Sequence, residues 1–169
     1  MLRFAVAALL ALTPCAAALG QASPPAAKPQ ETHFYPAEAN APAVLDAALA
    51  SARAQGKLAV VVFGADWCHD SRALARTLES DAFRSKFGSR FLVTFIDVGV
   101  PQTGKGRNLD LVKRFGVKNL KSTPALFVIS AKGKRINSKK DAIGWRNADS
   151  RGEAAILGWF DTVLADKAK

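Results

Sequence analysis

Cysteine is scarce in this sequence: among its 169 residues, only Cys15 and Cys68 carry a thiol. Cys15 lies in an N-terminal stretch that has the features of a removable signal, so Cys68 is expected to stand alone in the mature chain. An exported protein meets an oxidising compartment, in which cysteines are normally paired. A lone thiol there excludes an internal disulfide framework and indicates a thiol that is free or pairs with another molecule.

Histidine is as scarce as cysteine, with His33 and His69 alone. A metal site needs three or four ligands, so two histidines and one thiol argue against a metal site. The segment GKGRN, residues 104–108, is too short for a phosphate-binding loop and lacks its Lys-Ser/Thr end. No serine lies in a nucleophile-elbow motif. We therefore expect no metal and no cofactor.

Acidic side chains are few: 14 Asp and Glu oppose 24 Lys and Arg, which gives a net charge of +10. Inside a cell this balance would suggest a nucleic-acid partner. In an exported protein it indicates a solvated basic surface, or attraction to acidic partners or to an anionic membrane. We therefore expect no nucleic-acid partner. The densest basic cluster consists of Lys132, Lys134, Arg135, Lys139 and Lys140.

The first 22 residues have the features of an export signal. Arg3 precedes the apolar run FAVAALLAL, and small residues follow it. The run is too short to span a bilayer, which needs about 20 apolar residues. We predict a signal peptide over residues 1–22, cut after Ala22 or after Ala18, and hence a periplasmic or secreted protein. The LTPC stretch loosely resembles a lipoprotein signal, which would instead anchor the chain to a membrane through Cys15.

The remaining chain divides by composition into an arm and one domain. Residues 23–41 are rich in Pro and Ala and lack periodicity, as expected for a tether. Residues 42–169 have the length of a single domain, and 49% of the whole chain is hydrophobic, enough for a core. We predict that this domain is a monomer.

Continuous apolar runs at residues 58–63, 91–98 and 125–129 predict strands buried on both faces. The turn KGKR is expected to lead into a fourth, short strand. Helical spacing of apolar residues separates the strands, and Ser150 with Glu153 has the spacing of a capping box before the last helix. This alternation predicts an α/β fold with a central sheet of about four strands and helices on both faces.

Cys68 lies where the first predicted strand ends and a helix begins. The unpaired backbone N–H groups at a helix N-terminus favour an anion there, and the thiolate is the nucleophilic form of cysteine. A protonated His69 would support the thiolate, whereas Asp70 would oppose it. A buried, inert cysteine is the other interpretation of a lone thiol.

Two stretches, VVFGADWCHDS (61–71) and STPALFV (122–128), resemble the thioredoxin family. The similarity covers residues 43–166 and is greatest to exported thioredoxin-like domains, such as the C-terminal domain of the bacterial thiol–disulfide interchange protein. It implies a thioredoxin fold with a central mixed sheet and a cis peptide bond between Thr123 and Pro124, beside Cys68. It also implies a groove around Trp67, Pro124 and Gly144 that holds an extended polypeptide.

The sequence departs from the family at two positions. The family's second cysteine, three residues after the first, is here Ser71, and its buried strand aspartate is here Val62. Cys68 could therefore attack a disulfide but would have no internal thiol to release the product. The resemblance implies thiol–disulfide exchange by a monothiol mechanism, as an oxidoreductase or isomerase. The partners would be protein thiols and disulfides or a low-molecular-weight thiol.

Two other uses of the site stay open. The domain could be a non-catalytic module that binds peptide or protein partners, or Cys68 could be a redox sensor. The residues expected to contribute to the site are Cys68 and Ser71 for chemistry, and Trp67, His69, Asp70, Thr123, Pro124 and Gly144 for binding.

Overall fold

The computed structural model describes residues 32–37 and 39–167, and its centre is strand β1 (Leu58–Gly64). Strand β2 (Phe91–Asp97) pairs with β1 in parallel, and β5 (Ala125–Ile129) pairs with it antiparallel, which gives the order β2-β1-β5. The predicted α/β thioredoxin-like fold with a mixed central sheet is thus confirmed. The predicted signal peptide lies outside the described residues, as does the arm up to residue 31.

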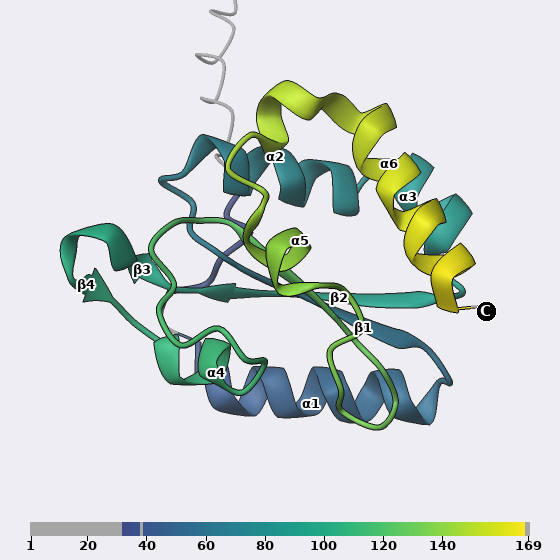
Figure 1. Ribbon diagram of the computed structural model, residues 1–169, viewed down its shortest axis with the longest axis horizontal. Helices are drawn as coiled ribbons and strands as arrows, with labels where there is room; N and C mark the ends of the chain where they lie inside the picture. The colour runs from purple at the N-terminus through teal and green to yellow at the C-terminus, as the bar shows by residue number, and fades with distance from the viewer. Residues whose placement is uncertain (1–31, 38, 168–169) are drawn as a thin grey trace, which may run out of the picture. The chain divides into compact units, whose positions relative to one another are not determined.

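Six helices in the described part of the chain flank the sheet. They are α1 (Ala41–Ala54), α2 (His69–Leu78), α3 (Asp81–Phe87), α4 (Leu109–Lys113), α5 (Lys139–Ile143) and α6 (Ala148–Lys167). Figure 1 shows α1 and α4 below the sheet and α2, α3 and α6 above it. Helix α5, whose first residues Lys139 and Lys140 belong to the basic cluster, was not predicted from the sequence.

The apolar run of β1 is continuous because both of its faces are covered. Alternate residues of β1 contribute to the two hydrophobic clusters of the domain. The cluster shared with α1 contains Ala59, Val61 and Phe63. The cluster shared with α2 and α6 contains Val60 and Val62. Successive side chains of a strand point to opposite faces, so every residue of this strand needs to be apolar. All seven residues of β1 are buried.

Four phenylalanines pack together where β2 begins. Phe83 and Phe87 of α3, Phe91 of β2 and Phe160 of α6 have ring centroids between 5.0 and 6.5 Å apart. Offset and edge-to-face contacts of this kind each add about 0.5–1.5 kcal/mol beyond the area that they bury. This aromatic cluster joins α3 and α6 to the sheet at the end remote from Asp97, the last residue of β2.

The prediction of about four strands is wrong in its count, because in the described residues the central sheet has three. The fourth strand is reduced to a single bridge between Ile129 and Arg135. Beyond it, the side-chain amide of Asn137 takes the place of a strand: it accepts from the N–H of Val128 at 2.9 Å and donates to the carbonyl of Leu126 at 3.0 Å. The amide thus satisfies backbone groups at the edge of β5 that a fourth strand would otherwise pair.

A two-stranded hairpin follows β2. Strands β3 (Gly99–Val100) and β4 (Lys105–Gly106) flank the short helix η1 (Pro101–Thr103). The buried carboxylate of Asp97 accepts from the N–H of Gly99 at 3.1 Å and lies 3.0 Å from the guanidinium of Arg107. Burial raises the pKa of Asp97, and the adjacent Arg107 opposes that rise. These contacts fix the hairpin to the carboxyl end of β2.

Part of the predicted arm is packed on the domain. Tyr35 is 2% exposed and belongs to the cluster of the α2 side, where its ring lies edge-on to Phe95 with centroids 5.4 Å apart. Phe34 packs against the same cluster. The ordered domain therefore extends N-terminally of the expected start at residue 42.

The capping box predicted for the last helix is not formed. Helix α6 begins at Ala148 and is interrupted at Gly152, whose φ of 73° lies in the left-handed region that glycine tolerates best. The hydroxyl of Ser150 donates to the carbonyl of Asn147, and Glu153 contacts Ser80 across the fold. The spacing of Ser150 and Glu153 therefore reflects two separate contacts.

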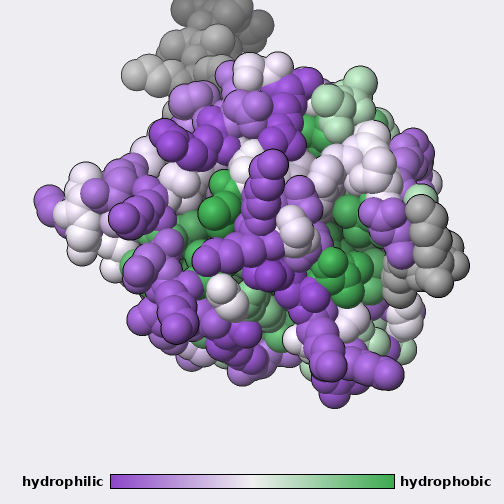
Figure 2. Space-filling model, in the orientation of Figure 1, coloured by the Kyte–Doolittle hydropathy of each residue, from purple (hydrophilic) through white to green (hydrophobic). Residues whose placement is uncertain are grey.

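Hydrophilic side chains cover most of the face seen in Figure 2, with hydrophobic groups visible between them. The large hydrophobic side chains that are most exposed are Trp67, Ile136 and Ile143. In the described part of the chain, no helix combines the length and hydrophobicity needed to cross a membrane.

Candidate thiol site

Cys68 lies at the carboxyl end of β1 and is the N-cap residue of α2, as its place in the sequence predicted. Its φ of −87° and ψ of 119° are extended, so the chain turns from strand to helix at this residue. The Sγ atom lies 3.7 Å from the carbonyl oxygen of Thr123. The Thr123–Pro124 peptide bond, just before β5, is cis.

A pocket of about 200 Å³ opens beside the thiol. Cys68 is only 7% exposed, but it is part of the pocket wall, so its burial differs from that of an enclosed core residue. The pocket is lined by Trp67, Cys68, Gln102, Lys121, Ser122, Thr123 and Arg146. Of the predicted site residues, the structure thus brings Trp67, Cys68 and Thr123 together around one pocket.

Ser71 lies behind the thiol and outside the pocket wall. It is fully buried, and its hydroxyl has no hydrogen-bond partner among the described residues. A side chain at Gly64 would approach the Ser71 Oγ atom to 2.8 Å and the ring of Tyr35 to 2.6 Å. Only glycine therefore fits at the end of β1 without displacing Ser71 and Tyr35.

Tyr35 is bonded to the first turn of α2. Its hydroxyl donates to the backbone carbonyl of Ser71 at 3.0 Å. Burial raises the pKa of Tyr35 well above its usual value, and negative charge on Cys68 and on Asp66 raises it further. The tyrosine is therefore held as a neutral hydrogen-bond donor close to the thiol.

Asp66 fixes the segment that contains Tyr35. Its carboxylate accepts from the N–H of Phe34 at 2.9 Å and from that of Tyr35 at 3.3 Å. The Nδ1 atom of His33 lies 3.4 Å from the same carboxylate, although the imidazole is largely exposed. The backbone carbonyl of Asp66 also accepts a hydrogen bond from Arg72 on α2. Asp66 thus ties the N-terminal segment to the thiol-bearing turn.

His69 and Asp70 do not line the pocket. The imidazole of His69 is 71% exposed and lies 3.4 Å from the carboxylate of Asp70. Asp70 is buried, and its Oδ1 atom accepts from the N–H of Asp149 at 3.0 Å. The Asp70 carboxylate thereby satisfies one of the backbone N–H groups that have no partner inside the first turn of α6. The geometry thus gives Asp70 a structural contact with α6.

Trp67 connects the site to the hairpin. Its indole Nε1 donates to the carbonyl of Gly99 at 3.0 Å, while 49% of the residue stays exposed. The ring therefore has a fixed position and an accessible face at the edge of the pocket. This combination suits contact with a bound polypeptide.

Gly144 and Pro124 lie outside the pocket wall. Gly144 ends α5, and its carbonyl accepts a hydrogen bond from Arg151. The guanidinium of Arg151 also lies 4.5 Å from the ring centroid of Trp145, which is fully buried. Two residues after Gly144, Arg146 reaches the pocket instead. This segment therefore contributes to the site through a cationic side chain.

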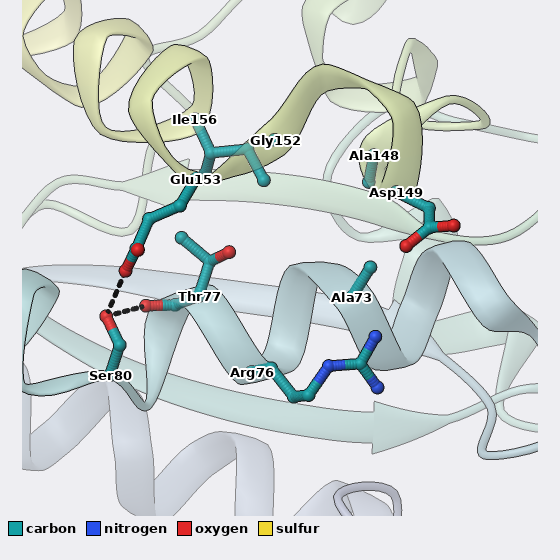
Figure 3. Close-up of a pocket in the computed structure, with 9 residues that line it drawn as sticks. All are labelled: Ala73, Arg76, Thr77, Ser80, Ala148, Asp149, Gly152, Glu153 and Ile156. Atoms are coloured by element: carbon teal, nitrogen blue, oxygen red, sulfur yellow. Dashed lines mark hydrogen bonds between the residues drawn. The ribbon is translucent and has the colours of Figure 1, made fainter.

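A larger pocket, of about 330 Å³, lies between α2 and α6. Figure 3 shows Ser80 and Glu153 turned toward each other across it, and the Ser80 hydroxyl lies 2.8 Å from the Glu153 carboxylate. Small residues such as Ala73 and Gly152 also line it. It contains neither the thiol nor the Thr123 segment, so we assign the candidate site to the smaller pocket.

The described residues contain no group of three or more His, Cys, Asp and Glu side chains that could share a metal ion. The chemistry that the site can supply rests on the Cys68 thiol.

Several residues around the thiol were not predicted from the sequence. Lys121 and Arg146 line the pocket, but they are separated from Cys68 by more than 50 positions and belong to no motif. Tyr35 had a signal that could have been used. Tyr35 directly follows Phe34 in a segment of Pro, Ala and polar residues. Segments that stay solvated contain few aromatic residues, so two adjacent ones indicate that this part of the arm is packed on the domain.

Comparisons with known proteins agree with this architecture. A family model described as a thioredoxin-like domain matches residues 45–141. The crystal structure of a disulphide isomerase from Xylella fastidiosa Temecula1 is similar, with a TM-score of 0.70 and 29% sequence identity. The similarity covers 79% of this chain and 98% of that protein. A search of curated proteins gives no significant match.

The family match spans more than half of the chain and includes β1, the Cys68 turn, the cis Thr123–Pro124 bond and β5. The chain therefore belongs to the thioredoxin-like domain family.

Proposed function

We propose that this protein carries out thiol–disulfide exchange through a single nucleophilic cysteine, Cys68, and that an external thiol completes the reaction. The observation that carries the proposal is the position of Cys68 at the start of α2, in the wall of a pocket that Thr123 also lines. The similarity to a disulphide isomerase supports the same class of reaction. Protein disulfides or a low-molecular-weight disulfide would be the substrates.

The reaction has two balanced steps. The Cys68 thiolate attacks one sulfur of a substrate disulfide; a new S–S bond joins Cys68 to that sulfur, and the other sulfur leaves as a thiolate. An external thiolate then attacks the substrate sulfur of this mixed disulfide. A disulfide forms between the external thiol and the substrate, and the Cys68 thiolate is released.

The residues around Cys68 support release of the mixed disulfide by an external thiol and not by a second group of the same chain. Ser71 stands where a second thiol would resolve the mixed disulfide, and a hydroxyl cannot be oxidised to a disulfide. Val62 is fully buried and lies opposite Phe95 of β2 and Leu126 of β5. This apolar setting offers no proton acceptor to a resolving group.

Turnover of bis(2-hydroxyethyl) disulfide with glutathione as the external thiol tests the proposal. We expect catalysis above the uncatalysed rate by the native protein and its loss in Cys68→Ser. Ser71→Ala is the matched control, because it removes the neighbouring hydroxyl and keeps the thiol. Its turnover should stay within about threefold of the native rate, since the Ser71 hydroxyl has no partner in the described residues. Equal rates for native protein and Cys68→Ser would overturn the proposal.

A non-catalytic binding module is the second candidate function, and the exposed face of Trp67 favours it. A module of this kind would hold an extended polypeptide beside the pocket without forming a mixed disulfide. Cell-envelope extract distinguishes the two functions. Exchange predicts partners that are covalently held by the native protein and lost in Cys68→Ser. Partners retained equally by Cys68→Ser and lost in Trp67→Ala would support the binding module.

We also propose that the reaction takes place outside the cytoplasm. The support is the N-terminal pattern of Arg3, an apolar run and small residues, which is typical of export signals. In an oxidising compartment, substrate disulfides and mixed disulfides of Cys68 would both persist.

A further inference from the structure

The pocket beside Cys68 carries two cationic side chains, and no acidic group of residues 32–37 and 39–167 pairs with either of them. Lys121 and Arg146 both line it and are exposed, and neither forms a hydrogen bond or an ion pair with another described residue. Other arginines near the site are engaged: Arg72 donates to the Asp66 carbonyl, and Arg107 pairs with Asp97. The charges of Lys121 and Arg146 are therefore available to a ligand.

The acidic residues closest in sequence to the thiol have other partners. None of the pocket-lining residues in the described chain is acidic. Asp66 accepts from the backbone of Phe34 and Tyr35, and Asp70 accepts from the backbone of Asp149. These hydrogen bonds hold both carboxylates in place outside the pocket wall, so the described residues that line the pocket include two cationic side chains and no anionic one.

Neutral donors complete the wall. Gln102 and Ser122, whose side chains carry an amide and a hydroxyl, are among the residues that line the pocket. The Oγ1 atom of Thr123 is buried without a hydrogen-bond partner among the described residues. A carboxylate accepts hydrogen bonds readily from amide, hydroxyl, ammonium and guanidinium groups. The donor set of this pocket thus matches an anionic ligand.

Building on the proposed exchange reaction, we propose that this pocket selects acidic disulfides, in which a carboxylate lies within a few bonds of the sulfur that Cys68 attacks. Lys121 and Arg146 determine this specificity. When the Cys68 thiolate attacks such a disulfide, its single negative charge passes to the departing sulfur while the substrate carboxylate stays negative, so two negative charges are close together throughout the step. The two cations offset this accumulation of like charge during the encounter and the attack.

Three small disulfides of similar length test the selectivity: 3,3′-dithiodipropionate is anionic, bis(2-hydroxyethyl) disulfide is neutral and cystamine is cationic. Rates of mixed-disulfide formation on Cys68 would be measured by mass spectrometry for the native protein and for Lys121→Gln, Arg146→Gln and the double variant. Comparing the same reagents across the variants cancels differences between the leaving thiols. Lys132→Gln, which removes an exposed charge from the turn after β5, is the matched control.

We expect the double variant to lower the ratio of anionic to neutral rates by about threefold to tenfold, because exposed ion pairs each contribute modestly. In Lys132→Gln, both the neutral rate and the ratio of anionic to neutral rates should stay unchanged. The native preference should also weaken as salt rises above about 0.1 M, where the screening length is about 10 Å. An unchanged ratio in the double variant would overturn the specificity proposal, even if the neutral disulfide reacts.

Alkylation of Cys68 tests the charge specificity of the pocket without any disulfide exchange. Iodoacetate is anionic and iodoacetamide is neutral, and both modify a thiolate without any disulfide. A preference for iodoacetate that the double variant loses supports the specificity of the pocket, whatever the exchange rates are. Equal iodoacetate-to-iodoacetamide rate ratios in native and double-variant protein count against it. Disulfide-linked peptides with Glu or Lys beside the cysteine then distinguish a polypeptide substrate from a small acidic disulfide.

Discussion

The hydroxyl of Tyr35 donates a hydrogen bond to the backbone carbonyl of Ser71, 3.0 Å away and 36 positions along the chain. This bond joins the segment before α1 to the first turn of α2, directly behind Cys68. The carboxylate of Asp66 holds the same segment from the other side of the turn. The N-terminal segment is thus a structural part of the thiol site.

The titration of Tyr35 tests its burial. Tyr35 is the only tyrosine in the chain, so tyrosinate absorbance reports this residue alone. Because its pKa is raised, folded protein should ionise Tyr35 only above the ordinary value of 10.0, and denaturant should restore that value. Above pH 10 the unfolded chain loses this proton while the folded chain keeps it, so the free energy of unfolding falls as pH rises. A midpoint at the ordinary value, with a native circular dichroism spectrum, would contradict the burial.

Removal of the Tyr35 hydroxyl should weaken the fold modestly. Tyr35→Phe keeps the ring and loses the hydrogen bond to Ser71, so we expect the free energy of unfolding to fall by about 1–2 kcal/mol in urea titrations. The variant should also lack the decline in stability above pH 10. Tyr35→Ala, which removes the ring as well, should cost about 3–5 kcal/mol. Equal stability of Tyr35→Phe and native protein would mean that the hydrogen bond contributes nothing.

The contact of Asp70 with α6 makes a separate prediction about stability. Asp70→Ala removes the acceptor of the Asp149 N–H, and we expect a loss of about 1 kcal/mol in the free energy of unfolding. Asp70→Asn is the control, because its side-chain oxygen can still accept this hydrogen bond. It should lose less stability than Asp70→Ala. If both variants are as stable as the native protein, the contact does not anchor α6.

A thiol at position 71 should form a disulfide with Cys68. The two residues lie one helical turn apart, within the distance that a disulfide spans. We expect Ser71→Cys to lose two hydrogens on mild oxidation, as seen by mass spectrometry, and to release trapped partners faster than native protein does. Ala73→Cys is the matched control, because Ala73 faces the pocket between α2 and α6. Two free thiols in oxidised Ser71→Cys would show that positions 68 and 71 do not face each other.

Export predicts a processed N-terminus. N-terminal sequencing of the protein from the cell envelope should begin at Ser23 or at Leu19, because small residues precede both positions. A lipid-modified Cys15 as the first residue would indicate an anchored form instead. Protein that keeps Met1 and remains in the cytosol would contradict export.

The sheet could be predicted because its evidence is local. A continuous apolar run such as residues 58–63 indicates burial on both faces, and Cys68 follows it at the change from strand to helix. The edge of β5 could not be predicted, because Asn137 acts there through its side chain and leaves no periodic pattern. Tyr35 was missed for a similar reason: its contact with Ser71 depends on how two distant segments pack.

The pocket shows the same limit. Its thiol and its adjacent tryptophan stand in a recognisable motif, whereas Lys121 and Arg146 are two of 24 basic residues and lie just outside the stretches that the family pattern fixes. Only the fold places them beside Cys68. Residues that set the charge of a pocket in this way can be identified from the structure, but their spacing in the sequence does not reveal them.

The aromatic cluster around Phe91 and the thiol site occupy opposite ends of the central strands. Phe91 and Asp97 are the first and last of the seven residues of β2, six steps apart, which is about 20 Å at 3.3 Å per residue. The aromatic packing around Phe91 therefore lies away from the pocket that Cys68 lines. A substitution beside Cys68 therefore leaves the ring contacts of Phe91 in place, and the far end of the sheet can stay folded while the thiol end changes.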